Sequence, residues 1–397
     1  MHRAAIALTA ALLALLRERR RRLRLRLLLE GASHRIQPSV PALPAGWATP
    51  SIAICGAGIS GLTLAGILSR RLGSRVAVTV LERASSDRDQ GYGLDLDQHG
   101  QEALARAGVY HRFWHISRPF SDSMAFFPMR GSEPLFVVFR PTLLKVLLPK
   151  RYAAQPESNR AALRDILMDE ISTHGNTRVL FKTAARGIRA SKAGGAELLD
   201  GTGQSLGEYD LVVDAMGLHS TLRLHRLNDA AGGKQFSGVV RIHGVINDPD
   251  ATCSEALLRK LRPYGSSLMV GRGYNFGLQR FGAGADDNRV AVQYPITHLD
   301  NEEELFRAIG ISAPRSRAAG IMTDERLDKV KEFVLRDMGD QFDDAWRDAV
   351  RCLERVLCAR IPLTATRRCV TTWRCHSSAS ATHRSTAGKA AVGTSRC

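Results

Sequence analysis

Residues 51–68 read SIAICGAGISGLTLAGIL, and residues 76–83 read VAVTVLER. The apolar run 51–55 predicts a short buried strand, and helically spaced apolar residues predict a helix over 59–72 that stops at Gly73. The unbroken apolar run 76–81 is typical of a parallel strand covered on both faces. Strand, glycine turn, helix and strand in this order predict a βαβ unit.

Three glycines occupy the turn of this unit in a G-x-G-x-x-G spacing. Gly56 suits the tight turn after the strand, Gly58 lets backbone approach a pyrophosphate, and Gly61 lets helix and strand pack closely. The first turn of the helix adds unpaired N–H groups and a positive dipole end. The pattern predicts a dinucleotide site, with a purely structural turn as the alternative.

The acid that such a site needs follows at the end of the second strand. Glu82 stands 21 residues after Gly61, where a carboxylate can accept hydrogen bonds from both hydroxyls of an adenosine ribose. A carboxylate there also disfavours a 2′-phosphate. The resident cofactor is therefore expected to be FAD or NAD rather than NADP.

Further along the chain the pattern alternates between helix and strand, and then turns to sheet. Residues 236–296 alternate apolar and polar side chains between turns, which predicts a mainly antiparallel sheet, and 301–357 returns to a helical period. Between these and the βαβ unit we expect helices over 101–107 and 160–171 and strands over 178–184, 196–200 and 209–213.

A family resemblance decides between FAD and NAD. The runs GAGISGLTLAGIL, VLER and QGYGLDLDQHGQEALARAGV resemble the single-component FAD-dependent monooxygenases, the flavoprotein aromatic hydroxylases of the p-hydroxybenzoate and salicylate hydroxylase type. The resemblance implies an α/β fold, with a Rossmann-like FAD-binding domain and an interleaved antiparallel-sheet substrate domain. It also implies cofactor contacts by Arg83 of the Glu-Arg pair and by Gly93, with Gly91 beside it.

Two later segments extend the resemblance. SNRAALRDIL is similar to the family's R-x-x-L-x-x-x-L helix, which would place Arg160 against the FAD, although an arginine on an amphipathic helix is alternatively a solvated one. YDLVVDAMGLHSTLR is similar to the family's Asp-Gly turn, and Gly217 matches it. Met216 stands where the family has the aspartate, which leaves the use of NAD(P)H open because a thioether accepts hydrogen bonds poorly.

The two ends of the chain depart from this pattern. Nothing after Pro362 matches the family's Gly-Asp motif, and residues 364–397 contain no acid, which suggests a changed reading frame or exon boundary. At the other end, an apolar run over 4–16 is followed by an arginine cluster. It fits a signal segment, an organelle-targeting leader or a mistranslated extension equally well, so a cytoplasmic and an organellar location both stay open. Membrane association is expected only through this segment.

These observations divide the chain into five parts. We expect a basic and apolar leader over residues 1–50 and an FAD-binding domain over 51–233. A substrate-domain sheet is expected over 234–300, a C-terminal helical part over 301–362 and an aberrant basic tail over 363–397.

The net charge of +17 does not indicate a nucleic-acid partner. Residues 1–50 carry +7 and residues 355–397 carry +8, so subtraction from +17 leaves +2 for residues 51–354. The histidines lack metal-ligand spacing, so no metal is expected, and the seven cysteines match no zinc or disulfide framework, with Cys253 standing alone.

The function implied by the resemblance is hydroxylation or epoxidation of a small apolar or aromatic substrate. NAD(P)H would reduce the FAD, and O₂ would supply the oxygen atom that is transferred. The residues point to no catalytic side chain. Two alternatives remain, a flavoprotein reductase or dehydrogenase on the same scaffold and a truncated, non-catalytic remnant.

Overall fold

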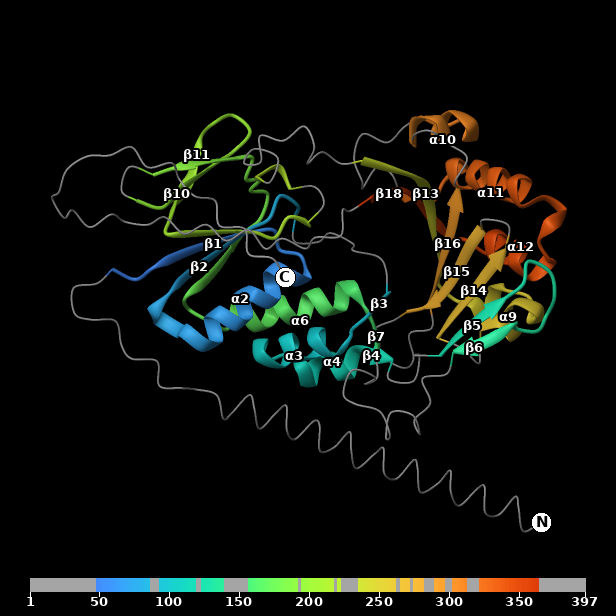
Figure 1. Cartoon of the computed structure of the whole chain (residues 1–397), viewed down its shortest axis with the longest axis horizontal. Helices are drawn as coiled ribbons and strands as arrows, with labels where there is room; N and C mark the ends of the chain where they lie inside the picture. The colour runs from blue at the N-terminus through green and yellow to red at the C-terminus, as the bar shows by residue number, and fades with distance from the viewer. Residues whose placement is uncertain are drawn as a thin grey trace, which may run out of the picture.

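A computed structural model describes most of the chain between residues 48 and 363 (Figure 1). The described residues are 48–85, 93–118, 123–138, 156–191, 194–217, 220–222, 235–261, 265–271, 274–281, 289–296, 302–312 and 321–363. The residues up to 47 and those from 364 onward lie outside them, and so does Gly91. The mixed α/β fold matches the predicted class.

The first unit is built on a parallel sheet with the strand order β12-β1-β2-β8. Its strands are β1 (Ser51–Cys55), β2 (Ala77–Leu81), β8 (Thr177–Leu180) and β12 (Leu211–Asp214). β1 is central and pairs in parallel with β12 and β2, as the predicted βαβ unit requires. The short turn η1 (Gly73–Arg75) separates the helix of that unit from β2.

Both faces of this sheet are covered. Ile54, Val78 and Val80 turn to one side and pack against the helices α2 (Ile59–Leu72), α3 (Gln98–Ala107), α4 (Tyr110–Ile116) and α6 (Arg160–Ser172). Ala53 and Val212 turn to the other side, toward the antiparallel strands β9 (Gly187–Ala190), β10 (Ala196–Leu199) and β11 (Ser205–Tyr209). Coverage on both faces explains why β1 and β2 are continuously apolar.

The second unit is an eight-stranded sheet in the order β17-β18-β13-β16-β15-β14-β5-β6. Its long antiparallel centre consists of β13 (Gln235–Ile246), β14 (Ser266–Gly271), β15 (Tyr274–Arg280) and β16 (Val290–Ile296). The remaining strands are β5 (Met124–Phe127), β6 (Phe136–Val138), β17 (Ile321–Met322) and β18 (Arg355–Leu363). The predicted antiparallel sheet over 236–296 is confirmed.

Three stretches of this sheet come from unexpected places, and the shortest is β17, which falls inside the stretch 301–357 where a helical period was expected. β18 forms where the helical period was expected to run on to residue 357, and it pairs with β13 over almost its whole length, so that part of the helix prediction is wrong. β5 and β6 come from residues 124–138, well before the predicted sheet segment 234–300. The five-part division stays a prediction, but the sheet draws on more of the chain than its assigned segment.

Helices cover one face of the eight-stranded sheet (Figure 1). Val240, Ile242 and Tyr294 lie in the same buried cluster as the helix residues Phe333 and Trp346. The helices of this unit are α8 (Pro249–Thr252), α9 (Glu255–Leu261), α10 (Glu302–Ile309), α11 (Glu325–Met338) and α12 (Asp344–Arg351), with η5 (Gly339–Gln341) between the last two. Because side chains alternate along a strand, Arg241, His243 and Val245 point to the opposite face.

That opposite face is turned toward the FAD-binding unit. The small sheet β3-β7-β4 lies between the units, with β3 over Gly93–Asp95, β7 over Glu157–Asn159 and β4 over Ser117–Arg118. A Cβ atom on Gly93 would lie 2.7 Å from the Cβ atom of Phe281, which packs against Val245. Among the described residues, no helix is long and apolar enough to cross a membrane.

Candidate cofactor site

The glycine turn joins β1 to α2 at the C-terminal edge of the parallel sheet. Gly56 has a φ of 113°, and a Cβ atom there would lie 2.7 Å from the carbonyl oxygen of Ala215 in the neighbouring turn. Its N–H donates to Leu81 O, which ties the turn to β2. Only glycine meets both the conformation and the close approach at this position.

The other two glycines of the motif face different surroundings. A Cβ atom on Gly61 would lie 2.0 Å from the carbonyl oxygen of Gly56, because α2 passes directly against the turn. Around Gly58, by contrast, a Cβ atom would meet nothing within 4 Å. Gly58 is the N-cap of α2 and provides no side-chain cap, so the first N–H groups of the helix are left for a ligand.

Glu82 lies directly after β2 and faces the same turn. One carboxylate oxygen accepts from Ala57 N at 2.9 Å, and the other accepts from Ala84 N at 2.8 Å. The Glu82 side chain therefore fixes the glycine turn and also lines a cleft at this edge of the sheet.

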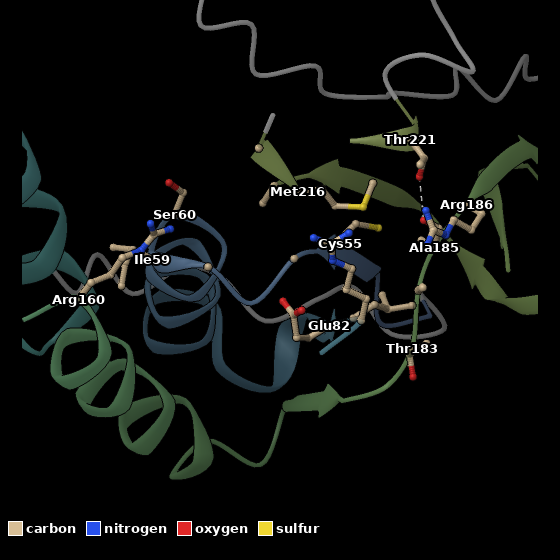
Figure 2. Close-up of a pocket in the computed structure, with 17 residues that line it drawn as sticks. Cys55, Ile59, Ser60, Glu82, Arg160, Thr183, Ala185, Arg186, Met216 and Thr221 are labelled. Carbon is tan, nitrogen blue, oxygen red and sulfur yellow. Dashed lines mark hydrogen bonds between the residues drawn. The ribbon is translucent and has the colours of Figure 1, made fainter. Parts of the chain in front are cut away.

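A cleft of about 320 Å³ opens above these residues (Figure 2). Three arginines line it, and Figure 2 shows Arg160 and Arg186 at opposite ends with Glu82 between them. Arg83 is the third. Their positive charges and the helix N-terminus suit a ligand with a diphosphate, whereas Glu82 suits its ribose. The other lining residues are Cys55, Gly56, Gly58, Ile59, Ser60, Leu81, Thr183, Ala184, Ala185, Ala215, Met216, Gly217 and Thr221.

α6 places Arg160 at the cleft and also contacts the glycine turn. Asn159 caps this helix, its side-chain oxygen accepting from Ala161 N at 2.7 Å and Ala162 N at 3.2 Å. Leu163 and Leu167 are fully buried. Arg164, also buried, donates from Nε to Ala57 O at 3.4 Å, so a second arginine of this helix contacts the turn.

The turn after β12 forms the wall opposite Glu82. Asp214 accepts from Met216 N at 3.0 Å and from the hydroxyl of Ser220, and thereby closes the turn on itself. Gly217 ends it with a φ of 65°. Met216 packs against the apolar cluster that contains Cys55, and Figure 2 shows the two side by side. Asp214 thus shapes the turn in which the family's usual aspartate is replaced by Met216.

The surroundings of Cys55 in this cleft favour the neutral thiol. Burial, and secondarily the charge of Asp214, raise the pKa of its thiol to about 12. The thiolate is therefore almost absent at neutral pH. Among the described residues, no group of three or more His, Cys, Asp or Glu side chains is placed to hold a metal ion.

Most of the residues singled out from the sequence come together here. Gly56, Gly58, Glu82, Arg83, Arg160 and Gly217 line the cleft, and Gly61 lies behind it. Gly93 does not line it: a Cβ atom there would lie 2.4 Å from Glu157 Oε1, so this glycine lets β3 pass close to β7. Sequence reasoning missed Arg164, Arg186 and Thr221, which carry no motif of their own. The individual roles of all these residues toward a cofactor stay proposals.

Comparison with known proteins places the chain in a family. A family model described as an FAD binding domain matches residues 49–269, which is more than half of the chain. The chain belongs to this FAD-binding family. It is a flavoprotein oxidoreductase, and its cofactor is FAD.

Solved structures share its fold at low sequence identity. An FAD-containing monooxygenase from Photorhabdus luminescens subsp. laumondii TTO1 is 18% identical, with a TM-score of 0.59 over 79% of this chain and 76% of its own. CtdE in complex with FAD and a substrate is 16% identical, with a TM-score of 0.58 over 79% and 69% of the chains. A salicylate hydroxylase substrate complex is 16% identical, with a TM-score of 0.55 over 79% of this chain and 69% of its own. No curated protein sequence matches.

The residues present fit the ADP half of FAD. The open space over Gly58 leaves room for a pyrophosphate, the uncapped N-terminus of α2 points at it, and Glu82 lies where the ribose would follow. Arg83, Arg160 and Arg186 line the same cleft and give it the positive charge that a diphosphate ligand requires. We infer that these groups hold the adenosine diphosphate part of the cofactor.

Proposed function

We propose that this protein is an FAD-dependent monooxygenase that hydroxylates or epoxidises a small apolar or aromatic substrate with NAD(P)H and O₂. The observation that carries the proposal is the combination of a cleft suited to FAD with a second unit whose sheet turns the face opposite its described helices toward the FAD-binding unit. Solved structures with this fold include an FAD-containing monooxygenase and a salicylate hydroxylase, which supports the same activity here.

The face of the eight-stranded sheet that is turned toward the FAD-binding unit supplies groups suited to orienting a substrate. His243 lies opposite Gln293 in the register of β13 and β16, and Arg241 donates from Nη1 to Gln293 Oε1 at 2.6 Å. Burial lowers the pKa of the Arg241 guanidinium, because its positive charge is partly removed from water. We propose that this cluster of Arg241, His243 and Gln293 anchors a polar group on an otherwise apolar substrate.

FAD, once bound and reduced, supplies the chemistry that activates O₂ and delivers one oxygen atom. The protein's own part is to bind and orient. The N-terminus of α2 and the arginines hold the diphosphate, Glu82 holds the ribose, and the sheet of the second unit presents the substrate and excludes water. Accordingly, no side chain is assigned a proton-transfer role.

The activity is tested on the full-length protein loaded with FAD. NAD(P)H oxidation and O₂ consumption are measured with a panel of small phenols and apolar alkenes, and the products are analysed for isotopically labelled oxygen from O₂. A monooxygenase consumes NAD(P)H and O₂ in equal amounts when a substrate is present, and one labelled oxygen appears in the product.

Other outcomes separate the alternatives. Reduction of a substrate without O₂ consumption would indicate a reductase or dehydrogenase. Failure to retain stoichiometric FAD would indicate a non-catalytic remnant, which Met216 in the cleft and the atypical residues after Pro362 favour.

A further inference from the structure

Two cysteines that are far apart in the sequence meet on the second unit, away from the cofactor cleft. Cys253 is the first residue after α8, and Cys352 is the first residue after α12. Cys352 Sγ donates at 3.1 Å to the carbonyl oxygen of Thr252, the residue directly before Cys253, so the backbone next to one cysteine contacts the thiol of the other. Both are partly buried and pack against the large core cluster of this unit.

The backbone on either side of the two cysteines is held in place by its own hydrogen bonds. Ser254 N donates to Asp348 Oδ2 at 2.7 Å, which joins the residue after Cys253 to α12. Asn247 N donates to Glu354 Oε1 at 2.8 Å, and Glu354 N donates to Val245 O at 3.0 Å. The thiols are therefore presented to each other by a framework that does not depend on them.

We propose that Cys253 and Cys352 form a redox-active pair, which hydrogen peroxide or an equivalent two-electron oxidant converts into a disulfide. The peroxide first oxidises one thiol to a sulfenic acid, with release of one water molecule. The second thiol then attacks that sulfur, the S–S bond forms, and a second water molecule leaves. Two thiols and one hydrogen peroxide thus give one disulfide and two water molecules.

The surroundings of the two cysteines favour their protonated thiols over the thiolates. Burial is the main cause that raises the pKa of both thiols, and the negative charge of Asp348 on α12 adds to it for each. Asp250 on α8 acts in the same direction on Cys253, whereas Lys331 on α11 acts in the opposite direction on Cys352. Because the thiolate is the reactive form, oxidation should be slow at neutral pH and faster as the pH rises.

The disulfide would link the end of α8, which follows β13, to the end of α12, which precedes β18, and these two strands are paired neighbours in the sheet. It would close a loop of roughly 100 residues, and cross-links over long loops restrict the unfolded chain most. We therefore expect oxidation to raise the melting temperature of the second unit by about 5–10 °C.

The full-length protein is treated with hydrogen peroxide, blocked with a thiol reagent, and digested without reduction for mass spectrometry. The expected product is one peptide pair, two hydrogens lighter than its parts, that joins Cys253 to Cys352. The rise in melting temperature should accompany it and disappear when dithiothreitol is added.

Serine variants identify the residues responsible. Cys253→Ser and Cys352→Ser should each abolish both the cross-link and the temperature shift. A matched control, in which Cys369, Cys375 and Cys397 are all replaced by serine, should retain both. If the mapped Cys253 is free, carries only higher oxides or is joined to another cysteine after oxidation, the proposal is wrong. The mapping uses the native sequence, so it stands even if a variant folds poorly.

Discussion

Gly58 and Gly61 belong to one sequence motif, but the structure gives them opposite tasks. Gly61 is required by the protein itself, since its hydrogen faces the backbone of Gly56, whereas Gly58 faces only the open cleft. A methyl group at these two positions therefore distinguishes folding from cofactor binding.

We expect Gly61→Ala to destabilise the protein by at least about 3 kcal/mol, the upper end for overpacking, because the added carbon meets a backbone oxygen that cannot move away alone. Gly58→Ala should fold with stability changed by less than about 1 kcal/mol, because the position has an ordinary extended conformation. Its FAD affinity should nevertheless fall tenfold or more. Denaturant unfolding without FAD and a flavin fluorescence titration measure the two effects, and a Gly58→Ala protein with native affinity would contradict the assigned pyrophosphate position.

Glu82 combines two tasks in one carboxylate, since it binds the N–H groups of Ala57 and Ala84 and also lines the cleft. Glu82→Ala should weaken FAD binding by about 1–3 kcal/mol, the range for hydrogen bonds to a charged group. Glu82→Gln retains one acceptor oxygen, so its FAD affinity should lie between that of Glu82→Ala and that of the native protein. Isothermal titration with FAD measures the loss, and unchanged affinity in Glu82→Ala would remove the ribose assignment.

The strand β12 leads into the turn in which Met216 replaces the family's usual aspartate, and the role of this turn can be tested. An aspartate flanks each end of this strand: Asp214 binds Met216 N and Ser220 on the cleft side, and Asp210 binds the N–H and hydroxyl of Ser51 at the far end. The two carboxylates make similar bonds, but only Asp214 shapes the cleft.

Asp214→Ala should lower both stability and FAD affinity, each by about 1–3 kcal/mol, because the turn at 215–217 loses the acceptor that closes it. Asp210→Ala is the matched control, and it should lower stability with little change in affinity. Thermal unfolding and FAD titration of both variants give the comparison. Equal losses of affinity in the two would show that the effect passes through the strand as a whole.

At the scale of the whole molecule, the positive charge is concentrated at the ends of the chain. Because residues 51–354 carry only +2, and Arg355 and Arg360 raise the charge of residues 51–362 only to +4, a fragment of residues 51–362 should not bind DNA or RNA in a salt-dependent manner. Mobility-shift assays at low and moderate salt, with the full-length chain beside the fragment, measure this. Salt-dependent binding retained by the fragment would place a basic surface on the folded units.

The sequence alone was sufficient to predict the α/β class and the location of the dinucleotide turn, because the residues that form this turn lie close together in the chain. The apolar strand, the glycines, the helix and Glu82 lie within about 30 consecutive residues, whose spacing directly determines which groups meet. The helix expected over 160–171 is likewise present as α6, and its helically spaced Leu163 and Leu167 are buried.

Only the tertiary structure decided the features that depend on contacts between distant segments. Arg164 reaches Ala57 from more than 100 residues away, and Arg186 and Thr221 enter the cleft from the segments that precede β9 and follow β12. β18 is a strand rather than the end of a helix because β13 supplies its backbone hydrogen bonds, which outweigh local periodicity. Cys253 and Cys352 meet for the same reason: packing of the folded chain, and no spacing in the sequence, determines which residues become neighbours.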